Sequence, residues 1–185
     1  KMRIPGIGGE VLRRVGAIPT AIPLGEIFTA LQTGVIDATE WVGPYNDVAM
    51  GLHQAARYYY YPGWQEPGPT LECIVNMNSW NSLPPDLQAI VRIACQATNL
   101  DMVSEFMARN AIALEQLAAD ESVEIRAFPD NVLAALKAKT FEVVEELAAE
   151  YPDVARVWRS YQDFMRRSQP WQEISEQAIL ATKQL

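Results

Sequence analysis

Strand-like and helix-like patterns alternate through the first 56 residues of the chain. Residues 2–5, 17–22 and 35–42 are apolar runs of strand length, and the stretches between them carry apolar side chains at helical spacing. Pro19 interrupts the second run, which predicts that this strand lies at the edge of its sheet. Because strands that alternate with helices usually pair in parallel, the pattern predicts an α/β fold with a mostly parallel sheet.

The remainder of the chain is predicted to be mainly helical, with a few further strands. An aromatic, proline-rich and glycine-rich stretch at 58–69 reads as a strand that enters a rigid loop. The segments predicted after it are a strand at 70–77, a long helix from 87 to about 120, a short strand at 123–128, and helices from 130 onward that break near 151–153 and 168–170.

Length and composition limit the classes of protein that the chain can represent. Its 185 residues, 49% of them hydrophobic, suit one compact domain or slightly more. A formal net charge of −8 argues against nucleic acid or an anionic membrane surface as a partner. No apolar run approaches the roughly 20 residues of a membrane span.

Motifs of catalysis are absent from the sequence. It contains no nucleophile elbow, phosphate loop, complete dinucleotide fingerprint or zinc motif. The single histidine, His53, has no second His or Cys beside it, so a packed or surface histidine is favoured over a catalytic base. The two cysteines, Cys73 and Cys95, fall in apolar runs and read as buried free thiols.

Three features, made up of four charged or aromatic residues, could build a binding site. Arg3 lies in a strand-like run that leads into a glycine-rich helix start, where a guanidinium could grip a carboxylate with two parallel hydrogen bonds. A simple ion pair with a surface acid explains Arg3 equally well. Glu40 and Trp41 lie together where the third strand gives way to a loop, although ordinary packing of Trp41 is favoured by composition alone.

Glu66 is the remaining candidate, and it lies in the proline-stiffened loop. Together, Glu40 and Glu66 would offer hard oxygen ligands, which suit Na⁺, Ca²⁺ or Mg²⁺ better than zinc. Their like charges would repel each other at short range unless a cation lay between them.

Four stretches of the chain closely resemble one known family. They are residues 1–6 (KMRIPG), 31–44 (LQTGVIDATEWVGP), 62–69 (PGWQEPGP) and 76–80 (NMNSW). Over essentially its whole length the chain resembles the extracytoplasmic solute-binding proteins of TRAP transporters, the DctP-type family. Within that family it is most similar to the branch that binds α-keto acids.

The resemblance implies a role for each candidate residue. Arg3 matches the arginine that binds the substrate carboxylate, and Glu40 matches a side-chain ligand of the bound metal. Trp41 corresponds to a residue that contributes its main-chain carbonyl to the metal and lines the substrate site. Glu66 falls where a further acidic residue lies near that metal. The implied cation is Na⁺, with Ca²⁺ as the alternative, bridging the protein and the ligand carboxylate.

The resemblance also implies a two-lobed protein of the periplasmic binding type, of which this chain is the C-terminal half. Residues 1–128 would form one α/β ligand-binding lobe, including a long helix that crosses toward the other lobe. Residues 129–185 would form a C-terminal helical region that can mediate dimerisation. We expect a mature fragment or truncated form, which lacks the signal peptide and the N-terminal half with its further ligands.

The predicted function is therefore that of a periplasmic receptor rather than an enzyme. It would bind a small α-keto acid such as pyruvate, with a cation, and deliver it to the membrane components of a TRAP transporter. The alternatives are a receptor for another carboxylate, either lactate with Ca²⁺ or a dicarboxylate, and, ranked below these, an enzyme acting on keto acids.

Overall fold

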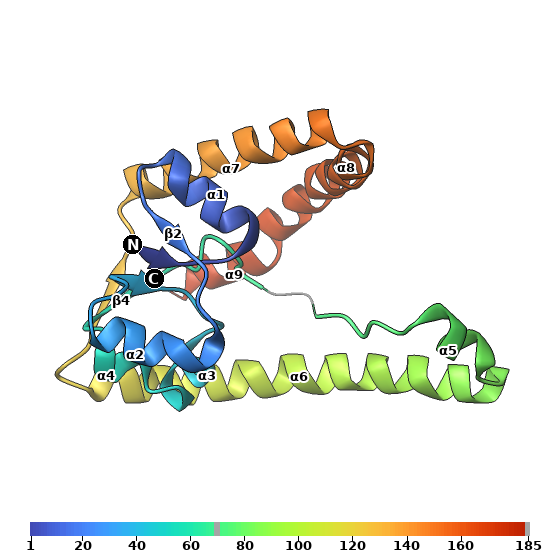
Figure 1. The fold of residues 1–185 in the computed structure, drawn as a ribbon, viewed down its shortest axis with the longest axis horizontal. Helices are drawn as coiled ribbons and strands as arrows, with labels where there is room; N and C mark the ends of the chain where they lie inside the picture. Colours follow the sequence, from blue (N-terminus) through green and yellow to red (C-terminus); the bar gives the residue numbers. More distant parts are fainter. Residues whose placement is uncertain (69–70, 184–185) are drawn as a thin grey trace. The chain divides into compact units, whose positions relative to one another are not determined.

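A computed structural model describes residues 1–68 and 71–183 of the chain (Figure 1). The last residue of the predicted loop, Pro69, and the first of the predicted strand, Thr70, lie outside the described residues, as do the final two residues of the C-terminal region. The chain divides into two compact units, Lys1–Leu133 and Ala134–Leu185, and each is described by itself.

A three-stranded parallel sheet organises the start of the first unit. Its strands are β1 (Met2–Arg3), β2 (Pro19–Thr20) and β3 (Ala38–Thr39), in the order β2-β1-β3. Met2 pairs with Pro19 on one side and with Ala38 on the other. The prediction that the Pro19 strand lies at the edge is confirmed, since β2 has only β1 as a neighbour in this sheet.

The helices that alternate with these strands supply the core. They are α1 (Gly6–Arg14), the short 3₁₀ helix η1 (Leu24–Glu26), α2 (Ile27–Gln32), α3 (Pro44–Ala49) and α4 (Leu52–Ala55). The helical pattern that follows Pro44 predicts one continuous helix through residues 44–56, but Gly51 takes a left-handed φ of 71° and separates α3 from α4. The core cluster consists of Ile27, Ala30, Leu31, Ile36 and Leu52.

A second parallel pair joins segments that lie far apart in the sequence. The strands β4 (Tyr58–Tyr61) and β5 (Glu124–Ala127) pair along their whole length, from Tyr58 opposite Glu124 to Tyr61 opposite Ala127. The long helix α6 (Pro85–Ala119) runs between them in the sequence. The prediction of an α/β fold with parallel strands and long C-terminal helices is confirmed.

The predicted strand at 70–77 is wrong for the residues that the structure describes. Residues 71–76 are extended but pair with no described strand, and Figure 1 shows them leading to α5 (Met77–Ser82). Asn76 ends the extended segment because its Oδ1 accepts hydrogen bonds from the backbone N–H of Asn78 at 2.9 Å and of Ser79 at 3.2 Å, which caps α5. An alternating apolar pattern makes a strand only where a neighbouring strand completes the hydrogen bonds.

The C-terminal end of α6 holds the start of α3 in place. Asn110 Oδ1 accepts a hydrogen bond of 2.9 Å from the backbone N–H of Tyr45, one of the donors that a helix start leaves without an internal partner. The Tyr45 ring meets Phe106 edge to face, with centroids 5.8 Å apart. A Cβ at Gly43 would lie 3.3 Å from Asn110 Oδ1, so the two segments approach closely.

A buried acid ties α3 to β4. Asp47 is about nine-tenths buried, and its Oδ2 accepts a hydrogen bond of 2.6 Å from the Tyr59 hydroxyl. Burial raises the pKa of Asp47, and the hydrogen bond from Tyr59 opposes that rise. Burial and the neighbouring Asp47 raise the pKa of Tyr59, so its hydroxyl remains a donor.

The second unit is helical. It contains most of α7 (Asp130–Glu150), then α8 (Pro152–Ile174) and α9 (Glu176–Thr182). The predicted break near 168–170 is wrong, because α8 continues through Pro170 and ends before Ser175. Proline inside a helix removes one hydrogen bond, and the turns around it can still continue.

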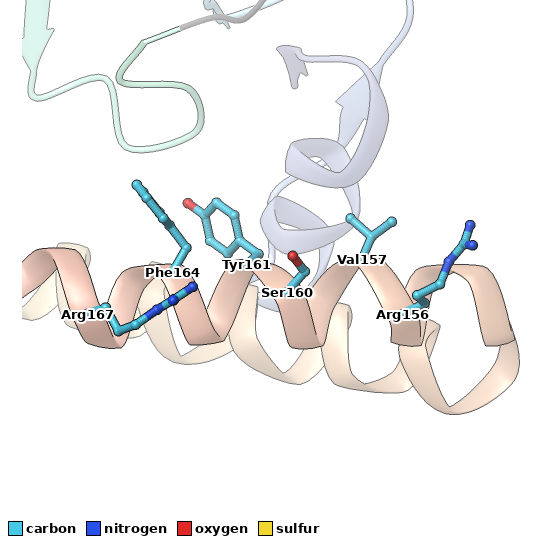
Figure 2. Close-up of a pocket in the computed structure, with 6 residues that line it drawn as sticks. All are labelled: Arg156, Val157, Ser160, Tyr161, Phe164 and Arg167. Carbon is cyan, nitrogen blue, oxygen red and sulfur yellow. The ribbon is translucent and has the colours of Figure 1, made fainter.

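The face of α8 shown in Figure 2 is apolar and exposed. Val157, Tyr161 and Phe164 project from the same side of the helix, and Arg156 and Arg167 flank them around an open hollow of about 610 Å³. Trp158 stacks on Tyr161 with ring centroids 5.8 Å apart. Among the described residues, no helix has both the length and the apolar composition that crossing a membrane requires.

Replacing Asn110 by alanine should weaken the joint between α3 and α6. The Tyr45 N–H loses its acceptor, and the expected loss is about 1 kcal/mol in the free energy of unfolding, measured by urea denaturation. Asn99→Ala is the matched control, since Asn99 is an exposed residue of the same helix. Alanine is the better helix former, so Asn99→Ala should not lose stability, and an equal loss in both variants would contradict the role of the cap.

Replacing Tyr59 by phenylalanine should leave the buried Asp47 carboxylate without its donor. The expected loss in the free energy of unfolding is about 1–3 kcal/mol. It should be larger at neutral pH than at a pH below the Asp47 pKa, because the hydroxyl stabilises the ionised carboxylate. Denaturant titrations at several pH values measure it, with Tyr58→Phe on the same strand as control. A loss that does not change with pH would contradict this account.

Candidate functional site

An ion pair between two adjacent strands forms the centre of the candidate site. The parallel register places Arg3 of β1 opposite Thr39 of β3, so Glu40 follows directly at the carboxyl end of the sheet. One terminal guanidinium nitrogen of Arg3 lies 2.5 Å from Glu40 Oε1, and the same nitrogen lies 3.4 Å from the Glu40 main-chain oxygen. Their side chains are only 12% and 11% exposed, so the pair is largely withdrawn from water.

Trp41 covers this ion pair from one side. The Arg3 Cζ lies 5.4 Å from the centroid of the Trp41 ring, a separation at which a guanidinium is attracted to an aromatic face. Trp41 is also partly buried against the core cluster that includes Ile27 and Leu31. The ring therefore packs and contacts Arg3 at once, and the two sequence interpretations of Trp41 are compatible.

The Arg3 guanidinium retains binding capacity. Its Nε is buried and has no hydrogen-bond partner among the described residues. The backbone around Glu40 is fixed, because the Thr39 hydroxyl donates to the Glu40 carbonyl oxygen at 2.9 Å and the Glu40 N–H donates to the Arg3 carbonyl oxygen at 3.3 Å. A buried donor in a fixed frame suits an added anion, and a carboxylate offers the geometry to meet it.

Glu66 acts on the ion pair electrostatically. Burial raises the pKa of Glu40 and Arg3 lowers it, while the negative charges of Glu66 and Asp47 raise it further. The Glu66 side chain itself is exposed. Its loop lies beside the start of α1, where a Cβ at Gly8 would be 3.6 Å from the Gln65 Cβ and 2.9 Å from Ile4 Cδ1.

The acidic residues alone do not complete a metal site. Within residues 1–68 and 71–183, no three His, Cys, Asp or Glu side chains gather closely enough to hold an ion. Glu40 and Glu66 can supply two oxygen ligands, so a bound ion would need further donors. The surplus of negative charge around Glu40 suits a cation.

Asp47 is a residue of this region that sequence reasoning missed. It affects Glu40 electrostatically and is anchored by Tyr59. Asp47 did not stand out because an acid in the first turn of a helix is normally explained by the helix dipole. Tyr59 did not stand out because it is one of four consecutive tyrosines. Only the burial of Asp47, which the sequence does not reveal, distinguishes it.

Comparison with known proteins places the chain in a family. Residues 1–151 match the model of the bacterial extracellular solute-binding proteins, family 7 (DctP). A curated relative is the monocarboxylate 2-oxoacid-binding periplasmic protein of Nostoc sp. strain PCC 7120, which is 41% identical over 176 residues. That alignment covers 95% of this chain and 48% of the relative.

Two solved structures are similar to this chain over nearly all of its length. A TRAP periplasmic solute-binding protein from Colwellia psychrerythraea, with bound calcium and pyruvate, is 44% identical with a TM-score of 0.93; the match covers 98% of this chain and 55% of that one. A second, from Pseudoalteromonas atlantica T6c with bound sodium and pyruvate, is 41% identical with a TM-score of 0.91 and coverages of 97% and 55%.

This chain spans about half the length of these relatives. The predicted resemblance is confirmed, and the family is one of binding proteins rather than enzymes. The chain belongs to the bacterial extracellular solute-binding proteins of family 7, the DctP family of TRAP transporters, and is similar within it to members described as binding 2-oxoacids or pyruvate.

Proposed function

We propose that this chain forms one lobe of a periplasmic TRAP receptor that binds a small 2-oxoacid, such as pyruvate, together with Na⁺ or Ca²⁺. The observation that carries the proposal is the buried Arg3–Glu40 pair under Trp41, at the carboxyl ends of two parallel strands. Ligands of α/β proteins commonly bind at this edge of a sheet.

Arg3 is the residue proposed to hold the ligand carboxylate. Its planar guanidinium can donate two parallel hydrogen bonds, and its Nε has no partner among the described residues. The Trp41 ring restricts where the guanidinium can move and excludes water from one side. The relatives from Colwellia and Pseudoalteromonas contain bound pyruvate, which supports a monocarboxylate as the ligand.

Glu40 is proposed as the side-chain ligand of the cation. The Trp41 main-chain oxygen and Glu66 are the other contributors within this chain. A bound cation would offset the repulsion that raises the pKa of Glu40, and it would draw the ligand carboxylate and keto oxygens toward the protein. Sodium accompanies pyruvate in one relative and calcium in another, so both ions belong to the proposal.

The remaining ligands are proposed to come from a second lobe. Apolar side chains are exposed on the extended segment and α6, and a second lobe would cover them: Leu71, Ile74, Ile90, Ile93, Leu100 and Val103. Residues 1–128 remain our prediction for the ligand-binding lobe. Residues 129–185 remain our prediction for a homodimer contact, which the exposed α8 face of Figure 2 suits.

Another carboxylate is the competing ligand. Lactate with Ca²⁺, or a dicarboxylate, would use the same guanidinium and the same acids. Thermal shift of the complete protein against pyruvate, lactate and dicarboxylates separates them, because a bound ligand raises Tm by mass action.

Replacing Arg3 by alanine in the complete protein should abolish most pyruvate binding. Loss of a buried, charged hydrogen-bonding partner is expected to cost about 2–5 kcal/mol, a weakening of roughly thirtyfold or more in calorimetric Kd. The pyruvate affinity of Arg3→Lys should be intermediate, because lysine keeps the positive charge but cannot donate two parallel hydrogen bonds. Arg13→Ala is the control, because Arg13 is an exposed arginine on the neighbouring α1. Pyruvate affinity unchanged in Arg3→Ala would remove Arg3 from the site.

Pyruvate affinity should depend on the cation through Glu40. Replacing Na⁺ by tetramethylammonium, with Ca²⁺ chelated, should weaken binding roughly tenfold or more, and Glu40→Gln should weaken binding and remove the cation dependence. Affinity should also fall as pH drops toward the raised pKa of Glu40, because the protonated acid cannot bind a cation. Glu121→Gln, at an exposed acid, should behave like the natural protein.

Equal pyruvate affinity in both salts would exclude the cation from the site. Cation dependence that persists in Glu40→Gln would place the ion on other ligands.

A further inference from the structure

Two thiols from distant segments face the same surface hollow. Cys73 lies in the extended segment 71–76, and Cys95 lies on α6. Both line a hollow of about 450 Å³, together with Trp80 and Val91. Neither cysteine forms a disulfide in this structure. Both are exposed, so the expectation of buried thiols is wrong. For Cys73 it failed because it assumed a paired strand at 70–77; Cys95 lies on the predicted helix, on a face that the described residues leave uncovered.

The spacing on each side directs the two thiols toward each other. Cys73, Val75 and Met77 alternate along the extended chain and line the hollow together, so they share one face of that segment. Val91 and Cys95 are four residues apart on α6, which places them on one helical face. The pKa of Cys95 is raised first by desolvation and second by the neighbouring Cys73 thiol.

Contacts beside the hollow hold its walls in place. The Arg92 guanidinium lies over the Trp80 ring, with Cζ 4.9 Å from the centroid. Gln88 Nε2 donates to the main-chain oxygens of Trp80 at 2.9 Å and Leu83 at 3.2 Å, which fixes the turn between α5 and α6. The Asn76 cap fixes the junction of the extended segment with α5. These contacts fix the end of the extended segment that carries Cys73 relative to the start of α6, the helix that carries Cys95.

We propose that Cys73 and Cys95 form an intramolecular disulfide, which ties the extended segment to α6. The oxidant is a disulfide of low molecular weight or of a thiol oxidoreductase. One cysteine thiolate attacks it, forms a mixed disulfide and releases one reduced thiol; the second cysteine then attacks the mixed disulfide and releases the other. Two thiols lose their protons and two electrons, and one disulfide is reduced.

The pair suits such a bond for two reasons. Both sulfurs are exposed in this chain, so an oxidant can reach them before the proposed second lobe covers the extended segment and α6. Residues 71–76 have no strand partner among the described residues, so a covalent link would supply a constraint that hydrogen bonds do not. Relatives of the chain are periplasmic proteins, and the bacterial periplasm favours disulfide formation. The proposal does not depend on the ligand or on Arg3.

Peptide mapping tests the bond directly. The complete protein is reduced and unfolded, refolded with glutathione disulfide, blocked with a maleimide and digested with trypsin. Cleavage after Arg57, Arg92 and Arg109 puts Cys73 on peptide 58–92 and Cys95 on peptide 93–109. We expect one cross-linked species containing both peptides, which a reductant separates. The oxidised protein should also melt about 5 °C or more above the reduced protein.

Two further variants control the geometry. The double variant Cys73→Ser, Ile74→Cys moves the thiol one residue along, to the opposite face of the extended segment, where Ile74 is 84% exposed. It should give glutathione adducts in place of the cross-linked peptides. Cys73→Ser alone should give a single adduct at Cys95. Separate glutathione adducts on both cysteines of the natural sequence, or a cross-link between two chains, would overturn the proposal.

Discussion

The ion pair between Arg3 and Glu40 is the interaction on which the candidate site depends. It connects the ends of β1 and β3, and both side chains are about nine-tenths withdrawn from water. Charges so placed are costly unless each has its partner, so the pair fixes both side chains and the Trp41 ring that lies over the guanidinium. The short parallel sheet beneath it sets the register that brings the two residues together.

The position of this pair is supported by contacts farther along the chain. The loop after Glu40 leads into α3, whose first turn is capped by Asn110 of α6 and whose Asp47 is held by Tyr59 of β4. The segment that carries Glu40 and Trp41 is therefore fixed by the sheet on one side and by α6 and β4 on the other.

Much of the α/β architecture could be predicted because its signals are local. Periodicity identified the strands around Arg3 and Glu40, and Pro19 indicated the edge strand. The residues that sequence reasoning missed act through distant contacts: Asp47 is notable for its burial, and Asn110 for the helix start it caps. The environment of Cys73 was predicted wrongly for a related reason, because a strand forms only where another strand pairs with it.

The same ion pair bears on which ligands the proposed receptor could accept. Arg3 and Glu40 pair at 2.5 Å through one guanidinium nitrogen, so an anion that displaced Glu40 from that nitrogen would leave the Glu40 carboxylate buried without a partner. The negative charges of Glu66 and Asp47 increase that cost, as the raised pKa of Glu40 indicates. A carboxylate that arrives with a cation replaces both partners at once, since the anion meets Arg3 and the cation meets Glu40. On the function proposed above, the pair therefore favours a carboxylate and a metal ion together over either one alone.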